Sequence, residues 1–333
     1  MSNLMKTRPF LYPVAIALAL LTPDFSARAD GGIIVKDGQK VAFLGDSITY
    51  QGWRVTGGYI NLVTSGLEAL GVKIVPIPAG VGGNTSVDML ARLDKDVLSK
   101  KPDWVTVSCG VNDVWHGANG GVPLEPYEKN ITSIVDQAQA AGIKVVILTS
   151  TVIDEDLNND NNKKLVAYND FLHQLAKARN LPIAEEGEAF QAAIKTTPPS
   201  PGTKLLTNDG VHPNSDGNQL MAAVLLQAFG ATPPQMEQVK KAWLDSPESA
   251  NVPVNFSLGT NLPISIRQYN VLKASAEAGK VTVYNFCHVL YRQSVEEACA
   301  SQLNKPPGKG NVEGEIGEEA QKNFLKKIAE LAK

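Results

Sequence analysis

The chain has 333 residues, 43% of them hydrophobic, which suffices for one α/β domain of ordinary size and an appendage. Its formal net charge is −3, and no run of Lys and Arg, alone or interleaved with aromatic residues, occurs along it. This balance argues against nucleic acid as a partner.

The first 29 residues are typical of a secretory signal peptide. Lys6 and Arg8 precede an apolar stretch over residues 11–21, and Ala27-Arg28-Ala29 forms a small-residue cleavage site. The apolar stretch is too short to span a bilayer, so we expect no stable membrane anchor, although an anchor that is never cleaved is the alternative. Cleavage near Ala29 would give a secreted or periplasmic protein.

From residue 40 to 229, short β-rich runs alternate with amphipathic stretches, as in βαβ units around a parallel sheet. The expected strands are residues 41–44, 73–76, 104–108, 144–149 and 181–184. Apolar residues recur at helical spacing between them, at Tyr59, Leu62, Val63, Leu67 and Leu70, at Leu90, Leu93 and Val97, at Ile131, Ile134 and Val135, and in a closing helix at Leu220, Val224, Leu225 and Phe229. Right-handed crossovers would place helices on both faces of the sheet.

Four short runs carry residues suited to acyl transfer. Residues 45–49 place Ser47 on a tight turn, and Asp209-Gly-Val-His212 offers a histidine base with a carboxylate that can orient it. Residues 80–85 and 110–113 form loops able to aim backbone N–H groups and the Asn112 amide at an oxyanion. The runs at 45–49, 80–85 and 110–113 each follow an expected strand, so they should meet at the carboxyl edge of the sheet.

In this order, the runs VAFLGDSIT, AGVGGNTS, GVND and DGVHPNSDG resemble those of the SGNH hydrolases, also called GDSL esterases and lipases, over about residues 41–229. The resemblance implies an α/β, flavodoxin-like three-layer sandwich with a central parallel sheet, and here a C-terminal extension. It makes Ser47 the nucleophile, His212 the base and Asp209 its partner. The oxyanion hole would comprise the N–H groups of Ser47 and Gly83 and the amide of Asn112, with Gly82 replacing Gly83 if the register differs by one.

The expected activity is that of a secreted serine ester hydrolase that removes short acyl groups, acetyl above all, from carbohydrate. Trp53 follows the serine run and Trp115 follows Asn112 by three residues, so both are expected at the rim of the site. There an exposed indole could stack on a sugar ring, and inward packing is the alternative. Lipases, lysophospholipases and thioesterases share the same runs, and a non-catalytic glycan-binding protein on this scaffold is a further alternative.

Other candidate sites are weak in this sequence, and we expect neither a metal ion nor an organic cofactor. A dinucleotide fingerprint beginning at Gly80 lacks its third glycine, because Thr85 stands there. A calcium loop beginning at Asp154 lacks its glycine and its bidentate glutamate, which are replaced by Asn159 and Leu165. His116, His173 and His288 are expected to have structural roles.

The sequence therefore divides into a signal peptide (1–29), a hydrolase domain (30–232) and a C-terminal extension of unknown role (233–333). In the extension we expect a helix to about Leu244, β-prone segments at 252–266 and 281–290, a loop at 304–317 and a helix from Glu318. Cys109 is expected to be a buried free thiol. Cys287 and Cys299 are the only plausible disulfide pair, and the alternative is that all three cysteines are free.

Overall fold

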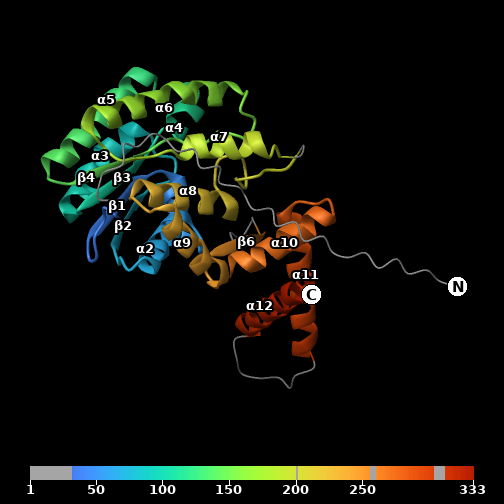
Figure 1. Ribbon diagram of the computed structural model, residues 1–333. Helices are drawn as coiled ribbons and strands as arrows, with labels where there is room; N and C mark the ends of the chain where they lie inside the picture. The colour runs from blue at the N-terminus through green and yellow to red at the C-terminus, as the bar shows by residue number, and fades with distance from the viewer. Residues whose placement is uncertain (1–31, 200–201, 256–259, 304–311) are drawn as a thin grey trace. The chain divides into compact units, whose positions relative to one another are not determined.

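The computed structural model describes residues 32–199, 202–255, 260–303 and 312–333 (Figure 1). The segment assigned above to the signal peptide lies outside these ranges. The described residues belong to one compact unit that begins at Gly32. None of the helices within these ranges combines the length and the apolar character that crossing a bilayer requires.

Five parallel strands form the central sheet, in the order β2-β1-β3-β4-β5. They are β1 (Lys40–Gly45), β2 (Val75–Gly80), β3 (Trp104–Ser108), β4 (Lys144–Leu148) and β5 (Ile183–Ala184). Residues 41–44 and 104–108 are buried on both strand faces, which explains why these segments are mostly apolar in sequence. The strand order is that of the flavodoxin-like fold, so the expected fold class is confirmed.

Helices cover both faces of this sheet (Figure 1): α3, α5 and α6 lie on one face, and α2, α8 and α9 on the other. The bounds in the first part of the chain are α1 (Ser47–Arg54), α2 (Tyr59–Ala69), α3 (Ser86–Asp96), α4 (Val111–Trp115), α5 (Leu124–Ala140), α6 (Asp160–Arg179), α7 (Glu186–Thr196), α8 (Ser215–Ala228) and α9 (Pro233–Asp245), with short 3₁₀ turns at Leu98–Lys100 and Gly117–Asn119.

The second expected strand was placed too early, at residues 73–76 rather than 75–80. Strand β2 pairs only with β1, so it is an edge strand, and its residues are mostly half-buried or exposed. It also contains Pro76 and Pro78, which an edge strand tolerates but which obscure its β pattern.

Beyond α9, the described residues form two antiparallel strands and three helices. These are β6 (Ala250–Asn255), β7 (Thr260–Ile264), α10 (Ile266–Ala278), α11 (Val283–Leu303) and α12 (Val312–Leu331). The expectation of a β segment at 281–290 was wrong. Cys287, Ser294 and Ala298 are fully buried at helical spacing on α11, which packs along α12, so one helix face rather than alternate residues is buried. Helix α12 begins at Val312, so the expected loop at 304–317 ends earlier than predicted, and residues 304–311 lie outside the described ranges.

The extension contacts the sheet-bearing part of the chain through buried groups. Trp243 of α9 is buried, and its indole N–H donates to the carbonyl of Leu62 at 3.1 Å. All three cysteines are free: Cys109 and Cys287 are buried, and Cys299 is half-buried. The structure therefore agrees with the alternative that all three cysteines are free, and Cys287 and Cys299 form no disulfide.

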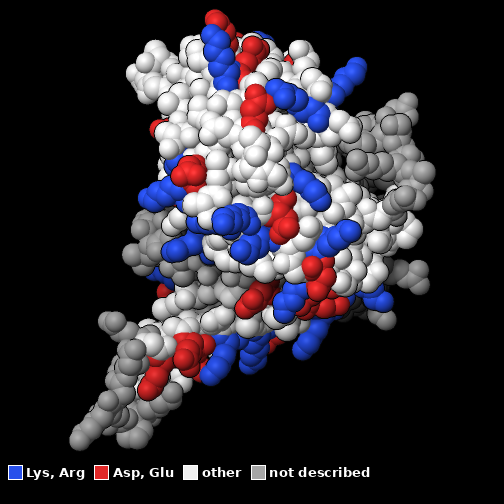
Figure 2. Space-filling view, turned by 90° about the vertical axis from the view of Figure 1, so that its left-hand side faces the viewer, with Lys and Arg blue, Asp and Glu red and all other residues white. Residues whose placement is uncertain are grey.

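On the face shown in Figure 2, basic and acidic side chains are interspersed, and neither kind forms a continuous patch. Ion pairs between surface side chains include those of Lys129 with Glu125 and of Arg179 with Asp136. Such a mixed surface differs from the basic stripe that proteins use to bind nucleic acid.

Candidate active site

Ser47 and Asn112 lie at the carboxyl ends of the adjacent strands β1 and β3, where the strand order reverses direction. Ligands bind at this switch point in open α/β sheets. Ser47 is the first residue of α1, and the carboxylate of Asp46 caps this helix by accepting from the N–H of Ile48 at 2.8 Å. The turn that presents the serine is thereby fixed by a side chain within the same sequence run.

The structure brings Ser47, His212 and Asp209 into one hydrogen-bonded chain. His212 Nε2 lies 2.9 Å from Ser47 Oγ, and His212 Nδ1 lies 2.7 Å from Asp209 Oδ2. An ionised carboxylate can only accept, so Nδ1 carries the ring proton, and Nε2 is left to accept from the serine hydroxyl. This is the geometry in which an imidazole can remove a proton from a nucleophile.

The Asp209 carboxylate is held in place by backbone donors as well as by the imidazole. Its Oδ1 accepts from the N–H of His212 at 2.8 Å and of Val211 at 3.0 Å. Partial burial alone would raise the pKa of Asp209, but the hydrogen bonds from His212 and from these backbone groups outweigh it and lower the pKa to about 2. Conversely, the hydrogen bond to Asp209 raises the pKa of His212 above its usual value, against the effect of burial.

The amide of Asn112 is buried beside the turn that carries Ser47. Its Nδ2 donates to the carbonyl of Asn84 at 3.0 Å and makes a longer contact of 3.5 Å with Asp46 Oδ2. Burial raises the pKa of Asp46 to about 6. The carbonyl of Asn84 therefore orients the Asn112 side chain, which lies next to the carboxylate of the residue directly before Ser47.

The glycine loop after β2 lies beside the serine. A Cβ atom added to Gly82 would lie 4.0 Å from Ser47 Cβ, and Gly83 has a φ of +76°, in the left-handed region that glycine adopts readily. We keep Gly83 as the expected donor of the second backbone N–H to the oxyanion, with Gly82 as the alternative. A side chain at Gly83 would strain the loop.

Arg92, which the motifs did not reveal, joins the ends of two strands to this loop. Its guanidinium donates to the carbonyls of Gly45 and Ala79, both at 2.8 Å, and to Asn84 Oδ1 at 2.6 Å. It therefore fixes the carboxyl ends of β1 and β2 and the residue whose carbonyl orients Asn112. The only signal in the sequence was a charged residue beside the buried Leu93 of α3.

The two tryptophans differ in exposure. Trp115 is 48% exposed and lies at the end of the short helix α4 that carries Asn112, whereas Trp53 is half-buried near the end of α1. The indole of Trp115 is thus exposed enough to stack on a sugar ring, whereas the indole of Trp53 is only partly exposed.

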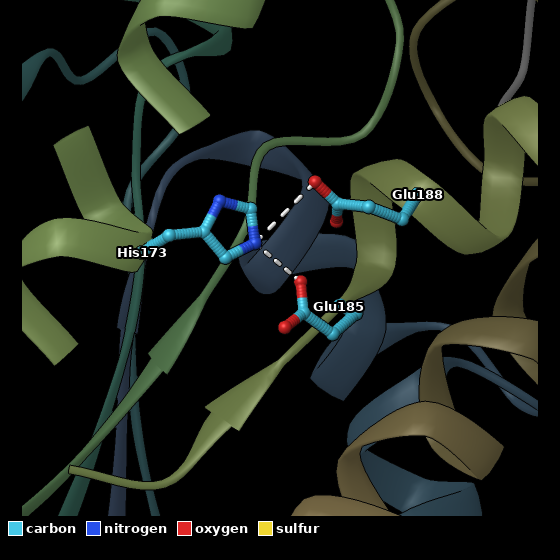
Figure 3. Close-up of side chains that lie close together, drawn as sticks. All are labelled: His173, Glu185 and Glu188. Carbon is cyan, nitrogen blue, oxygen red and sulfur yellow. Dashed lines mark hydrogen bonds and ion pairs between the residues drawn. The ribbon is translucent and has the colours of Figure 1, made fainter. Parts of the chain in front are cut away.

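Among the described residues, one group of three side chains has its ligand atoms close enough to share a metal ion: His173, Glu185 and Glu188 (Figure 3). His173 Nε2 lies 2.5 Å from a Glu185 oxygen and 3.6 Å from a Glu188 oxygen, and Glu188 also accepts from the hydroxyl of Thr149. The hydrogen bond to Glu185 raises the pKa of His173. A charge-assisted hydrogen bond accounts for this contact. None of these residues belongs to the serine, histidine and aspartate chain.

Comparison with known proteins identifies the family to which this geometry belongs. The model of the GDSL-like lipase/acylhydrolase family matches residues 43–220, which is more than half of the chain. The protein belongs to this family. It is thus an SGNH hydrolase and a carboxylic ester hydrolase, as the four sequence runs indicated.

An acetylxylan esterase from Geobacillus stearothermophilus is 30% identical over 216 residues, which cover 59% of this chain and 96% of the relative. Esterase TesA from Pseudomonas aeruginosa is 30% identical over 142 residues, covering 42% of this chain and 63% of the relative. Among solved structures, the acetyl xylan esterase AlAXEase is 35% identical with a TM-score of 0.53, covering 57% of this chain and 98% of its own. Solved variants of the Geobacillus enzyme are described as catalytic mutants of a serine, an aspartate and a histidine, the last two being three residues apart.

Proposed function

We propose that this protein is a secreted or periplasmic serine esterase that removes short acyl groups, acetyl above all, from carbohydrate, with Ser47, His212 and Asp209 as its catalytic residues. The observation that carries the proposal is the hydrogen-bonded chain from Ser47 Oγ through the imidazole to Asp209. The catalytic aspartate and histidine of the Geobacillus acetylxylan esterase have the same spacing as Asp209 and His212.

In the first half of the reaction, Ser47 Oγ attacks the ester carbonyl carbon while His212 Nε2 takes the hydroxyl proton. The carbonyl oxygen becomes an oxyanion, which the N–H of Ser47, the N–H of Gly83 or Gly82 and the Asn112 amide stabilise. Asp209 keeps Nδ1 protonated and stabilises the imidazolium that forms. The intermediate then collapses, the bond to the alcohol oxygen breaks, and His212 gives its proton to the leaving alcohol.

In the second half, water repeats these steps on the acyl-enzyme. His212 Nε2 takes a proton from water as the water oxygen bonds to the acyl carbon, and Ser47 Oγ leaves with that proton restored to it. The products are a carboxylic acid and the free alcohol. No electron transfer is involved, and every proton that moves passes through His212.

Two experiments test the catalytic assignment. A fluorophosphonate probe should label the wild-type protein at Ser47 alone, and Ser47→Ala should lose ester hydrolysis by about 10⁴-fold or more. The substitution removes a single oxygen from the first turn of α1, so the melting temperature should stay close to that of the wild type. Turnover retained by a clean Ser47→Ala preparation would refute the assignment.

The choice of a short acyl group on carbohydrate is supported by the acetylxylan esterase relatives and by the exposed indole of Trp115 on the helix that carries Asn112. The test compares kcat/KM for 4-nitrophenyl acetate and octanoate, and measures acetate released from acetylated xylan and pectin. Preference for octanoate, with no acetate from any glycan, would favour a lipase. If the enzyme prefers the acetate ester, Trp115→Ala should raise KM for the acetylated glycan more than for 4-nitrophenyl acetate. Only the glycan has a sugar ring that can stack on the indole.

The proposed location depends on residues 1–29, with their basic start, apolar stretch and Ala27-Arg28-Ala29 site. Export in a bacterial host followed by N-terminal sequencing should show a mature protein that begins at Asp30. A full-length protein retained in the cytoplasm would contradict this part of the proposal and leave the catalytic part unaffected.

A further inference from the structure

The proposed base and its aspartate lie between α7 and α8. The described residues 202–214 of this segment contain no helix and a single isolated β-bridge, between Thr207 and Pro213. We call residues 204–214 the acid–base loop. Ser47 and Asn112 lie in helices next to the sheet, so their positions follow from the fold. The acid–base loop needs other contacts to hold His212 within hydrogen-bonding distance of Ser47.

Glu155, 50 residues before Leu205 in the chain, supplies several of these contacts. Its carboxylate accepts four hydrogen bonds from three consecutive residues of the loop. Oε1 accepts from the N–H of Leu206 and of Thr207, both at 2.8 Å, and from Thr207 Oγ1 at 2.7 Å. Oε2 accepts from the N–H of Leu205 at 2.5 Å. Glu155 is only 5% exposed, so water competes little for these donors.

The hydrogen bonds continue from Glu155 to the residue next to Asp209. Thr207 Oγ1, which donates to Glu155, also accepts from the N–H of Gly210 at 3.1 Å. The N–H of Asp154, the neighbour of Glu155, donates to the carbonyl of Gly210 at 2.7 Å. Both sides of Gly210 are therefore held by the 154–155 segment, directly or through Thr207. Gly210 lies between Asp209 and the N–H groups of Val211 and His212 that orient the Asp209 carboxylate.

We propose that Glu155 is a positioning residue for the proposed reaction: through Thr207, it fixes the acid–base loop so that His212 meets both Asp209 and Ser47. The inference rests on the proposed function, because it gives Glu155 a role in the proton transfer rather than in folding alone. Glu155 touches none of the reacting atoms. Its effect on catalysis comes from the geometry of the loop that it binds.

Glu155→Gln is the main test, because it keeps the shape of the side chain and replaces one acceptor oxygen by a donor. The new NH₂ group would face a backbone N–H, so at least one of the four bonds is lost. We expect kcat for 4-nitrophenyl acetate to fall by about 10- to 100-fold with little change in KM, since small displacements of a catalytic group have effects of this size. Asp156→Asn is the matched control: it makes the same chemical change one residue away, at an exposed side chain.

The pH profile separates positioning from a loss of folded protein. The charged groups that face His212 are Asp209 on its own loop and Asp46 after β1. If the loop shifts, the bond between His212 and Asp209 weakens, so the acid limb of kcat/KM should move to lower pH in Glu155→Gln. A variant that merely unfolds more easily would lose amplitude at every pH and keep the same limb.

Thr207→Val and Thr207→Ser provide a second pair in case Glu155→Gln does not fold. Valine removes the hydroxyl that links Glu155 to Gly210 and keeps the side-chain volume, whereas serine retains the hydroxyl. We expect Thr207→Val to lower kcat and to shift the acid limb, and Thr207→Ser to restore both.

The inference would be overturned if folded Glu155→Gln had the kcat of the wild type and the same acid limb in its pH profile. If Glu155→Gln does not fold, the same result for Thr207→Val would overturn it. Labelling of Ser47 by fluorophosphonate in the wild type tests the proposed function separately. If the wild type is labelled and these variants behave like it, only the role of Glu155 fails.

Discussion

Replacing Asn112 with alanine should lower kcat by about 10²- to 10³-fold while KM changes much less. The buried amide of Asn112 is proposed to donate to the oxyanion, which exists in the transition state and the intermediate but not in the bound ester. Loss of such a donor therefore lowers the rate of the chemical step rather than the affinity for substrate.

The hydrogen bonds of Asn112 set this magnitude. Its Nδ2 carries two hydrogens, one of which is committed to the Asn84 carbonyl at 3.0 Å. The other meets Asp46 Oδ2 only at 3.5 Å, beyond the range of about 2.7–3.2 Å for good N–H···O bonds. That hydrogen is thus available to an oxyanion, and its loss corresponds to roughly 2.7–4 kcal/mol of transition-state stabilisation.

Steady-state kinetics with 4-nitrophenyl acetate at pH 8 would measure the effect, with melting temperatures to confirm folding. Asn158→Ala makes the same change at an exposed side chain and should behave like the wild type. Asn112→Asp should be worse than Asn112→Ala at this pH, because it places a second carboxylate beside Asp46, whose pKa is about 6. A kcat for Asn112→Ala within threefold of the wild type would refute the oxyanion role.

Four further measurements follow from the structure. His212→Ala should be nearly as damaging as Ser47→Ala and the double variant little worse, since the two act as one unit; multiplied losses in single-turnover assays would contradict this. Asp209 raises the pKa of His212 above its usual value of about 6.5, and only the neutral imidazole accepts a proton. Activity should therefore fall as the pH drops below the raised pKa of His212. A rate that stays constant down to pH 4 would rule out His212 as the base. Burial raises the pKa of Glu186 well above its usual value, and its carboxylate oxygens have no hydrogen-bond partner. This carboxyl group therefore stays protonated in the folded state at pH values at which it ionises in the unfolded state. Its contribution to the free energy of unfolding should decrease as the pH rises above about 4.5. In urea melts, Glu186→Gln should reduce that slope by up to about 1.4 kcal/mol per pH unit, and an unchanged slope would argue against it. Truncation after Leu244 should lower the melting temperature, and an unaltered melting curve would show that the extension is dispensable.

The sheet and the serine run could be predicted because the signals for both are local. Strands β1 and β3 are inner strands of a sheet covered by helices on both faces, so residues 41–44 and 104–108 are buried and mostly apolar. The turn after β1 is also encoded locally, because Asp46 caps the helix that Ser47 begins. Asp209 and His212 are three residues apart, so their pairing was visible as well.

The supporting residues could not be predicted because their partners are distant in the chain. Glu155 binds residues 50–52 positions away, and Arg92 reaches a carbonyl 47 positions away. Nothing in the sequence around Glu155 distinguishes it from the exposed acids on either side. Helix α11 was missed for a different reason. Its β-branched and aromatic residues suggested a strand, and only packing along α12 shows which face is buried.

The extension contacts the start of α8, directly after the acid–base loop. Ser215 Oγ donates to the carbonyl of Asn251 at 2.8 Å, and Lys273 forms an ion pair of 2.6 Å with Asp216, which is buried. The acid–base loop is therefore held at its N-terminal side by Glu155 and bounded at its C-terminal side by a helix whose first turn the extension binds. Removing the extension would take away both of these contacts with the first turn of α8. The loss of stability on truncation should thus begin at α8, next to the proposed base, and reduce activity at temperatures below global unfolding.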